Sequence, residues 1–190
     1  MSAPRDDPLV AAERILRYFN GKPILRVRYF SQEFTLHGYS DASYNDDPNT
    51  SRSVSGFLFL PCGGPVTWSF KKQPVIALSS CESEYIALAY ASQEAIYLSD
   101  FLCELTFPGF SSVQMYEDNI SALHLAGNAA FSTRTKHICT RYHFLRELVA
   151  ANKIIVSHVK TLEHLADIFT NFWDCSKFKI TLNKIYNFGS

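Results

Sequence analysis

Apolar positions near the start of the chain recur at helical spacing. Pro8 suits the first turn of a helix, and Gly21 suits the position after its last turn. The pattern between them predicts a helix over residues 8–20, with an apolar stripe made of Leu9, Ala12, Ile15, Leu16 and Phe19. Residues 24–30 then alternate between apolar and basic side chains, which predicts an exposed or edge strand.

Three strands are expected next. They cover residues 34–44, 54–60 and 66–70, and the first two are separated by the turn-rich run 45–51. The sequence Cys62-Gly-Gly-Pro65 makes the second turn. Short turns between consecutive strands predict an antiparallel meander.

A long helix follows the meander. Ser79 and Glu82 have the spacing of a capping box, and apolar positions continue at helical spacing to Leu105. The remaining pattern predicts, in order, a strand at 113–116, a helix at 119–125, a loop at 129–136, a helix at 138–151, a strand at 154–159 and a helix at 162–169. The tail from Asn171 is aromatic and basic, and we assign it no element.

This order of elements predicts an α/β fold with a mixed five-stranded sheet flanked by helices. It places carboxylates on the first strand, the long helix, the fourth strand and the last helix, namely Asp41, Glu84, Asp118 and Asp167. Hard divalent cations choose oxygen ligands, so four acids gathered at one sheet edge predict two Mg²⁺ ions about 4 Å apart, which Mn²⁺ can replace. Each acid alone is equally typical of a helix cap, a first-turn residue or a solvated position.

Composition narrows the function classes. The 190 residues are 47% hydrophobic and 19% charged, which indicates a folded domain with a surface suited to a protein partner. A net charge of zero predicts weak sequence-independent nucleic-acid binding. Five cysteines without a C-x-x-C pair favour free thiols, and no apolar run has membrane-spanning length. We expect a cytoplasmic or nuclear protein without a membrane partner.

Several motifs resemble the ribonuclease H domain of copia-type retrotransposon polyproteins. They are Gly38-Tyr-Ser-Asp41-Ala, Val66-Thr-Trp68-Ser-Phe-Lys71-Lys72-Gln73, Ala77-Leu-Ser-Ser80-Cys-Glu-Ser-Glu84-Tyr, Asp118-Asn119, Arg134-Thr-Lys136-His137, Arg141-Tyr-His143 and Leu165-Ala-Asp167-Ile. The resemblance covers about residues 12–170 in matching order. It implies a ribonuclease H-like domain over 32–170, a connection to a reverse transcriptase over 1–31 and a divergent tail over 171–190.

The resemblance also implies a function. Asp41, Glu84, Asp118 and Asp167 are the expected metal-binding and catalytic residues, with two Mg²⁺ ions and the RNA strand of an RNA–DNA hybrid as substrate. Integrases and transposases place their glutamate last, whereas here it is second. The order of the four acids in this chain therefore favours ribonuclease H.

Further residues are candidates for substrate contact or proton transfer. Expected substrate-binding residues are Asn119, Lys71, Lys72, Arg134, Lys136 and Arg141, although solvated turns and a helix start explain them as well. His164 and His137 are candidate proton carriers, and Trp68 and Tyr85 are expected in the core.

The chain departs from the family pattern at Cys139-Thr140 and after Thr170. These departures leave open a domesticated, non-catalytic protein that acts through a host protein partner in regulation, cell death or genetic conflict.

Overall fold

The computed structural model describes residues 6–21, 27, 29, 35–105, 110–127 and 139–186. Its centre is one five-stranded sheet in the order β3-β2-β1-β4-β5. The strands are β1 (Leu36–Ser43), β2 (Val54–Pro61), β3 (Thr67–Lys72), β4 (Val113–Glu117) and β5 (Ile154–His158). The helices are α1 (Asp6–Asn20), α2 (Ser80–Glu104), α3 (Ile120–Gly127), α4 (Cys139–Ala150), α5 (Asp167–Thr170) and α6 (Cys175–Tyr186), and a 3₁₀ turn spans Thr161–Glu163.

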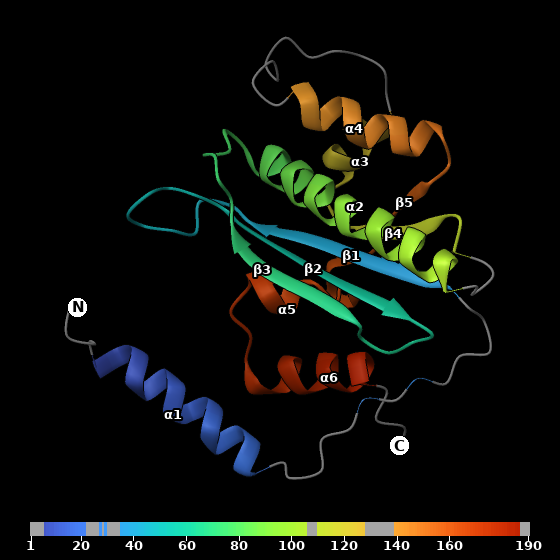
Figure 1. The fold of residues 1–190 in the computed structure, drawn as a ribbon. Coiled ribbons are helices and arrows are strands. Elements are labelled where there is room, and N and C mark those ends of the chain that lie inside the picture. The colour runs from blue at the N-terminus through green and yellow to red at the C-terminus, as the bar shows by residue number, and fades with distance from the viewer. Residues whose placement is uncertain are drawn as a thin grey trace.

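The sheet is mixed, as the order of elements predicts. β1, β2 and β3 pair antiparallel through short turns, whereas β1 pairs with β4, and β4 with β5, in parallel. A parallel pair needs a long crossover, and α2 makes the one between the meander and β4. This crossover brings β4 beside β1 at the centre of the sheet (Figure 1).

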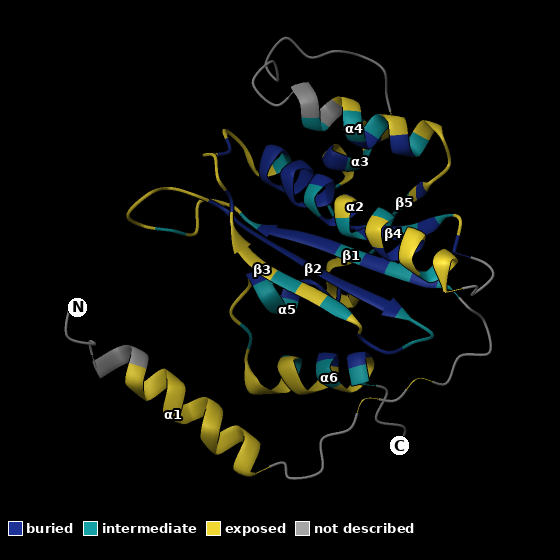
Figure 2. Cartoon of the chain, viewed as in Figure 1, coloured by how far each residue is buried: buried dark blue, intermediate teal, exposed yellow. Residues whose placement is uncertain are grey.

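Helices cover the two faces of the sheet unequally. α2, α3 and α4 lie on one face, and α5 and α6 lie on the other (Figure 1). The larger core lies under α2 and contains Phe57, Phe59, Tyr85, Leu88 and Met115. A smaller core on the opposite face joins the sheet to α5 and α6 through Leu58, Leu60, Leu165 and Ile185. Figure 2 shows that burial is concentrated in β1, β2 and the first half of α2.

The start of α2 agrees with the predicted capping box. The hydroxyl oxygen of Ser79 accepts a hydrogen bond from the backbone N–H of Glu82 at 3.2 Å, and a Glu82 carboxylate oxygen accepts one from the N–H of Leu78 at 3.0 Å. These bonds satisfy N–H groups that a helix start leaves without partners. They fix the first turns of α2, and Glu84 lies there.

Helix α1 confirms the helix predicted over residues 8–20. Its apolar side chains are exposed, and Leu16 is 69% exposed. Figure 2 shows α1 at the edge of the molecule with its described residues exposed.

Other predictions differ from the structure. The helix expected at 162–169 is wrong, because the chain forms a 3₁₀ turn there and α5 begins only at Asp167. The unassigned tail contains α6, which begins where the Asp174 carboxylate accepts bonds from the N–H groups of Ser176 and Lys177. Trp68 is 60% exposed because β3 is an edge strand, whereas Tyr85 is fully buried as predicted.

Two expectations cannot be compared with the structure. The strand at 24–30 falls largely outside the described residues, and the loop at 129–136 falls wholly outside them. Among the helices that the structure describes, each is too short or too polar to span a membrane.

Candidate metal centre

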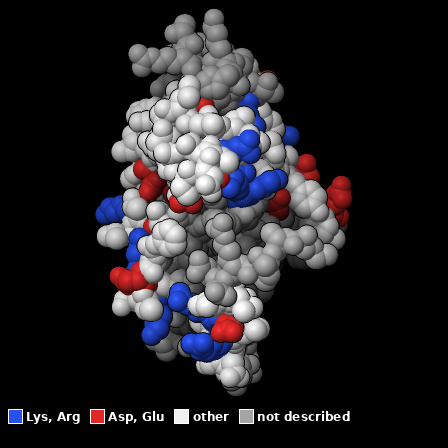
Figure 3. Space-filling view, turned by 90° about the vertical axis from the view of Figure 1, so that its left-hand side faces the viewer, with Lys and Arg blue, Asp and Glu red and all other residues white. Residues whose placement is uncertain are grey.

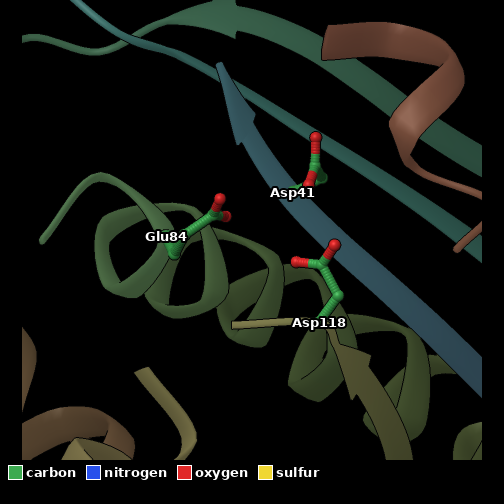
Figure 4. Close-up of side chains that lie close together, drawn as sticks. All are labelled: Asp41, Glu84 and Asp118. Atoms are coloured by element: carbon green, nitrogen blue, oxygen red, sulfur yellow. The ribbon is translucent and has the colours of Figure 1, made fainter. Parts of the chain in front are cut away.

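Three carboxylates converge beside the central strands. Asp41 lies near the end of β1, Asp118 directly follows β4, and Glu84 lies in the second turn of α2. Each contributes an oxygen, and these oxygens all lie within 4.8 Å of one another. Figure 4 shows the three side chains pointing toward a common space from their three elements. We call Asp41, Glu84 and Asp118 the three-carboxylate cluster.

The sheet register explains this meeting. β1 and β4 run parallel with Tyr39 opposite Tyr116, so the residues that follow on both strands reach the same edge of the sheet. Ligand sites in open α/β sheets form at the carboxyl ends of such strands. Glu84 joins the cluster because the cap at Ser79 places the first turns of α2 beside β1.

A further acid, Glu117, adjoins the cluster and was not among the predicted site residues. Glu117 is fully buried at the end of β4. One of its carboxylate oxygens accepts a hydrogen bond from the Ser40 hydroxyl at 3.0 Å, and the other accepts one from the N–H of Asn119 at 3.3 Å. Residues 113, 115 and 117 share the buried face of β4, so the alternation of Val113 and Met115 was a usable signal for Glu117.

Burial, followed by the repulsion between neighbouring carboxylates, raises the pKa values of Glu84 and Asp41. Burial raises the pKa of Glu84 well above its ordinary value, and the carboxylates of Glu117, Asp41 and Asp118 raise it further. Burial also raises the pKa of Asp41, against the opposing effects of His164 and Thr170. One Glu84 oxygen, Oε2, is buried without a hydrogen-bond partner. A divalent cation would relieve both the repulsion and this unsatisfied oxygen, so these residues fit one.

Asp167, the fourth predicted ligand, lies outside the three-carboxylate cluster among the described residues. It begins α5, is 2% exposed, and is close enough to Asp41 to raise the pKa of that carboxyl. Its Oδ2 atom lies 2.9 Å from Nζ of Lys177 in α6, and its Oδ1 atom accepts a hydrogen bond from Asn171. The neighbouring Thr170 hydroxyl donates to Asp41.

Of the two candidate proton carriers, His164 lies next to the cluster and His137 lies outside the described residues. His164 is buried, and its Nδ1 atom lies 3.9 Å from Oδ1 of Asp41. Neither ring nitrogen has a hydrogen-bond partner. The imidazole therefore lies beside the Asp41 carboxylate, and no hydrogen bond from a described residue holds its ring nitrogens.

Part of the predicted substrate-binding set lies together. Lys71, Lys72 and Arg141 line one pocket of about 190 Å³, together with Gln73 and Tyr90 among others. Lys72 also forms an ion pair with Asp47 at 2.5 Å. Arg134 and Lys136 lie outside the described residues.

Asn119 is a helix-start residue in the structure. Its side-chain oxygen accepts bonds from the N–H groups of Ser121 and Ala122, at 3.0 and 3.1 Å. Asn119 directly follows Asp118 in the sequence, so the start of α3 lies beside the three-carboxylate cluster.

Charges on the surface are mixed. On the face seen in Figure 3, Lys and Arg side chains gather in separate groups with Asp and Glu between them. The described residues on this face therefore form no continuous basic surface, in agreement with the net charge of zero.

Comparison with known proteins identifies relatives of this chain. It is 36% identical over 171 residues to the retrovirus-related Pol polyprotein from transposon RE2 of Arabidopsis thaliana, a match that spans 90% of this chain and 12% of the polyprotein. It is 36% identical over 170 residues to the corresponding polyprotein from transposon TNT 1-94 of Nicotiana tabacum, spanning 90% and 13%. The chain thus spans about an eighth of the length of these relatives. No family model matches it.

Solved structures agree on the fold. The N-terminal RNase H domain of rv2228c from Mycobacterium tuberculosis is similar with a TM-score of 0.54 and 12% identity, over 80% of this chain and 98% of that one. LC11-RNase H1 in complex with an RNA/DNA hybrid is similar with a TM-score of 0.51 and 15% identity, over 71% and 93%. The chain is therefore a homologue of one segment of the retrovirus-related Pol polyproteins of transposons, and it has the ribonuclease H fold.

Proposed function

We propose that this chain is a ribonuclease H that hydrolyses the RNA strand of RNA–DNA hybrids with Mg²⁺. The observation that carries the proposal is the convergence of Asp41, Glu84 and Asp118 in a largely buried site that suits a hard cation. Two further facts support it: relatives are transposon polyproteins, and a protein with the same fold has been solved with an RNA/DNA hybrid.

The chain's own residues supply position and charge. Asp41, Glu84 and Asp118 would hold the cation, which supplies an activated water and stabilises the leaving 3′ oxygen when bound. Hydrogen bonds from Thr170 to Asp41 and from Thr161 to Asp118 at 2.8 Å orient two of these carboxylates. His164 faces Asp41 and is the candidate group for moving a proton.

Recognition of the hybrid would use separate groups. Lys71, Lys72 and Arg141 gather at one pocket and suit backbone phosphates. Asn119 follows Asp118 directly, where its amide suits a ribose 2′-hydroxyl that distinguishes RNA from DNA. Arg134, Lys136 and His137 stay predictions for the same roles.

The first experiment is cleavage of a labelled RNA–DNA hybrid by the purified chain in Mg²⁺ and in Mn²⁺. Replacing even an outer-shell partner of a metal costs about 10–100-fold in affinity or activity, so loss of the direct ligand in Asp41→Asn should abolish measurable cleavage. Asp46→Asn is the matched control, because Asp46 is an exposed acid in the loop after β1 and should leave the rate unchanged. Equal rates for Asp41→Asn and the unmodified chain would contradict the assignment.

A second candidate is a non-catalytic protein that binds a host protein. The exposed apolar side chains of α1 favour it, because such a helix suits a partner surface. This reading expects no hybrid cleavage by a folded chain with cation present, and cellular function that survives loss of the carboxylates. A phenotype lost in Asp41→Asn while folding is normal would contradict it.

A further inference from the structure

The C-terminal segment engages both oxygens of Asp167. Nζ of Lys177 lies 2.9 Å from Oδ2, and the Asn171 amide donates to Oδ1. Both partners lie in the 171–190 segment, where the sequence departs from the family pattern. Asp167 is only 2% exposed, whereas the Lys177 side chain is 38% exposed, so the ion pair joins a buried carboxylate to a partly exposed ammonium.

Lys177 is held in place by more than this ion pair. Its Nζ atom lies 4.0 Å from the centroid of the Trp173 ring, a distance that favours a cation–π contact. Its backbone N–H donates to the Asp174 carboxylate at 2.8 Å, which fixes the first turn of α6. Further along the helix, Ile185 is buried against Leu58, Leu60 and Leu165. The ammonium is thus presented to Asp167 by a helix packed on the sheet.

We propose that Lys177 is an internal cation that competes with a second divalent ion for Asp167. While α6 is packed on the sheet, the chain holds one ion, at the three-carboxylate cluster. A second ion at Asp167 requires the ammonium to leave, because an ion on either carboxylate oxygen would lie close to Nζ of Lys177, and two cations so close in a buried site repel strongly. This inference rests on the proposed function, since it assumes that the cluster binds a divalent ion.

Contacts between α5 and Asp41 connect the position of Lys177 to the three-carboxylate cluster. Asp167 and Asp41 interact electrostatically, and Thr170 of the same short helix donates to Asp41. The positive charge of Lys177 therefore lies on the Asp167 side of the cluster, which is the position that a second divalent ion would occupy. Binding of a second ion at Asp167 then depends on α6, which carries Lys177 and contributes no residue to the three-carboxylate cluster.

Direct counting of bound Mn²⁺ tests this inference without any substrate. Free Mn²⁺ is followed by its electron paramagnetic resonance signal during titration of the folded chain. Lys177→Met removes the charge but keeps a long side chain that can still cover Trp173. Lys179→Met is the matched control, because Lys179 is exposed on the same helix. Lys177→Arg keeps the positive charge.

We expect one Mn²⁺ per chain for the unmodified protein, Lys179→Met and Lys177→Arg at concentrations where Lys177→Met holds two. The second ion should bind to Lys177→Met at least about tenfold more tightly than it binds to the unmodified chain. Should that variant fold poorly by circular dichroism, Lys177→Gln replaces it, and the count for the unmodified chain still tests the inference.

Contrary outcomes separate this inference from the proposed function. Two equally tight ions in the unmodified chain, or one ion in every variant, would overturn the role of Lys177 and leave the cluster as a metal site. Absence of binding in all variants would overturn both the competition and the proposed metal dependence.

Discussion

At the scale of single residues, the site gathers acids that repel one another. Asp41, Glu84 and Glu117 are all buried, and burial is the largest cause of the raised pKa of each. Such an arrangement weakens the folded chain when the acids ionise and strengthens its hold on a cation. The cluster is therefore expected to lower the stability of the cation-free folded chain and to raise its affinity for a divalent cation.

The pH dependence of stability follows from Glu84. Its pKa rises from 4.5 to about 11 on folding, so the folded chain keeps a proton that the unfolded chain releases within this range. The free energy of unfolding should then fall as pH rises through the window, and Tm should drop on the order of 5 °C between about pH 6 and pH 8.5 without cation. Thermal scans followed by circular dichroism measure this.

The control for that prediction is Glu84→Gln, which cannot ionise and should lose a large part of the pH dependence. Mg²⁺ or Mn²⁺ should raise Tm of the unmodified chain more at the higher pH, where the carboxylates are freer to ionise. A Tm that rises with pH in the absence of cation would show that the cluster does not repel itself as described.

At the scale of elements, tight contact between α5 and β2 positions Thr170 against Asp41. A Cβ atom added at Gly56 would lie 2.9 Å from Cβ of Phe169 and 3.1 Å from Cγ2 of Thr170. The absence of a side chain at Gly56 thus lets α5 approach the strand that pairs with β1. This helix carries both Asp167 and the hydroxyl that donates to Asp41.

Gly56→Ala should therefore displace α5 and destabilise the chain by about 1–3 kcal/mol, the usual cost of overpacking. Gly127→Ala is the matched control, because its added Cβ meets nothing within 4 Å. That change should alter stability by less than about 1 kcal/mol and in the stabilising direction. Urea denaturation measures both. Equal midpoints for the two variants would contradict the close approach.

The elements also show what the sequence could predict and what it could not. Local signals sufficed for β1, β2, α2 and α4, because alternation, the Ser79 cap and helical spacing act over a few residues. The segment 162–169 misled, since its apolar residues do not share one helical face: Leu162 in the 3₁₀ turn is 80% exposed, and the buried Leu165 and Ala166 lie between that turn and the short helix α5. For α6, the spacing of Phe178, Leu182 and Ile185 was available in the sequence, and the Asp174 cap would have marked its start.

The candidate site was predictable only in part for a similar reason. Asp41, Glu84 and Asp118 each follow a local motif and do come together. The engagement of Asp167 by Lys177 depends on how α6 packs against the sheet, and no spacing along the chain reports that packing. The alternation of Val113 and Met115 places Glu117 on the buried face of β4, but alternation alone does not show that this acid adjoins Asp41 and Asp118.

At the scale of the whole molecule, the smaller core makes the C-terminal segment an integral layer of the fold. α6 covers the sheet face opposite α2 through Ile185, so the segment that contains it is not a peripheral appendage. In contrast, α1 leaves its apolar residues exposed. The two ends of the chain thus contribute differently: the last helix completes a face of the sheet, and the first presents an apolar surface.

The parallel contact between β1 and β4 has a consequence for the order in which the molecule assembles. Ser40 and Glu117 are 77 positions apart in the sequence, and their hydrogen bond ties the strands that bring Asp41 beside Asp118. Contacts of such long separation form after the local hairpins, so a cation should meet a complete set of ligands only late in folding.

Stopped-flow experiments should then show slower unfolding in Mg²⁺ than without it, at an unchanged refolding rate. Faster refolding in Mg²⁺ would instead place the ligands together in the transition state. A bound cation would thus prolong the lifetime of the native chain without shortening the path by which it is reached.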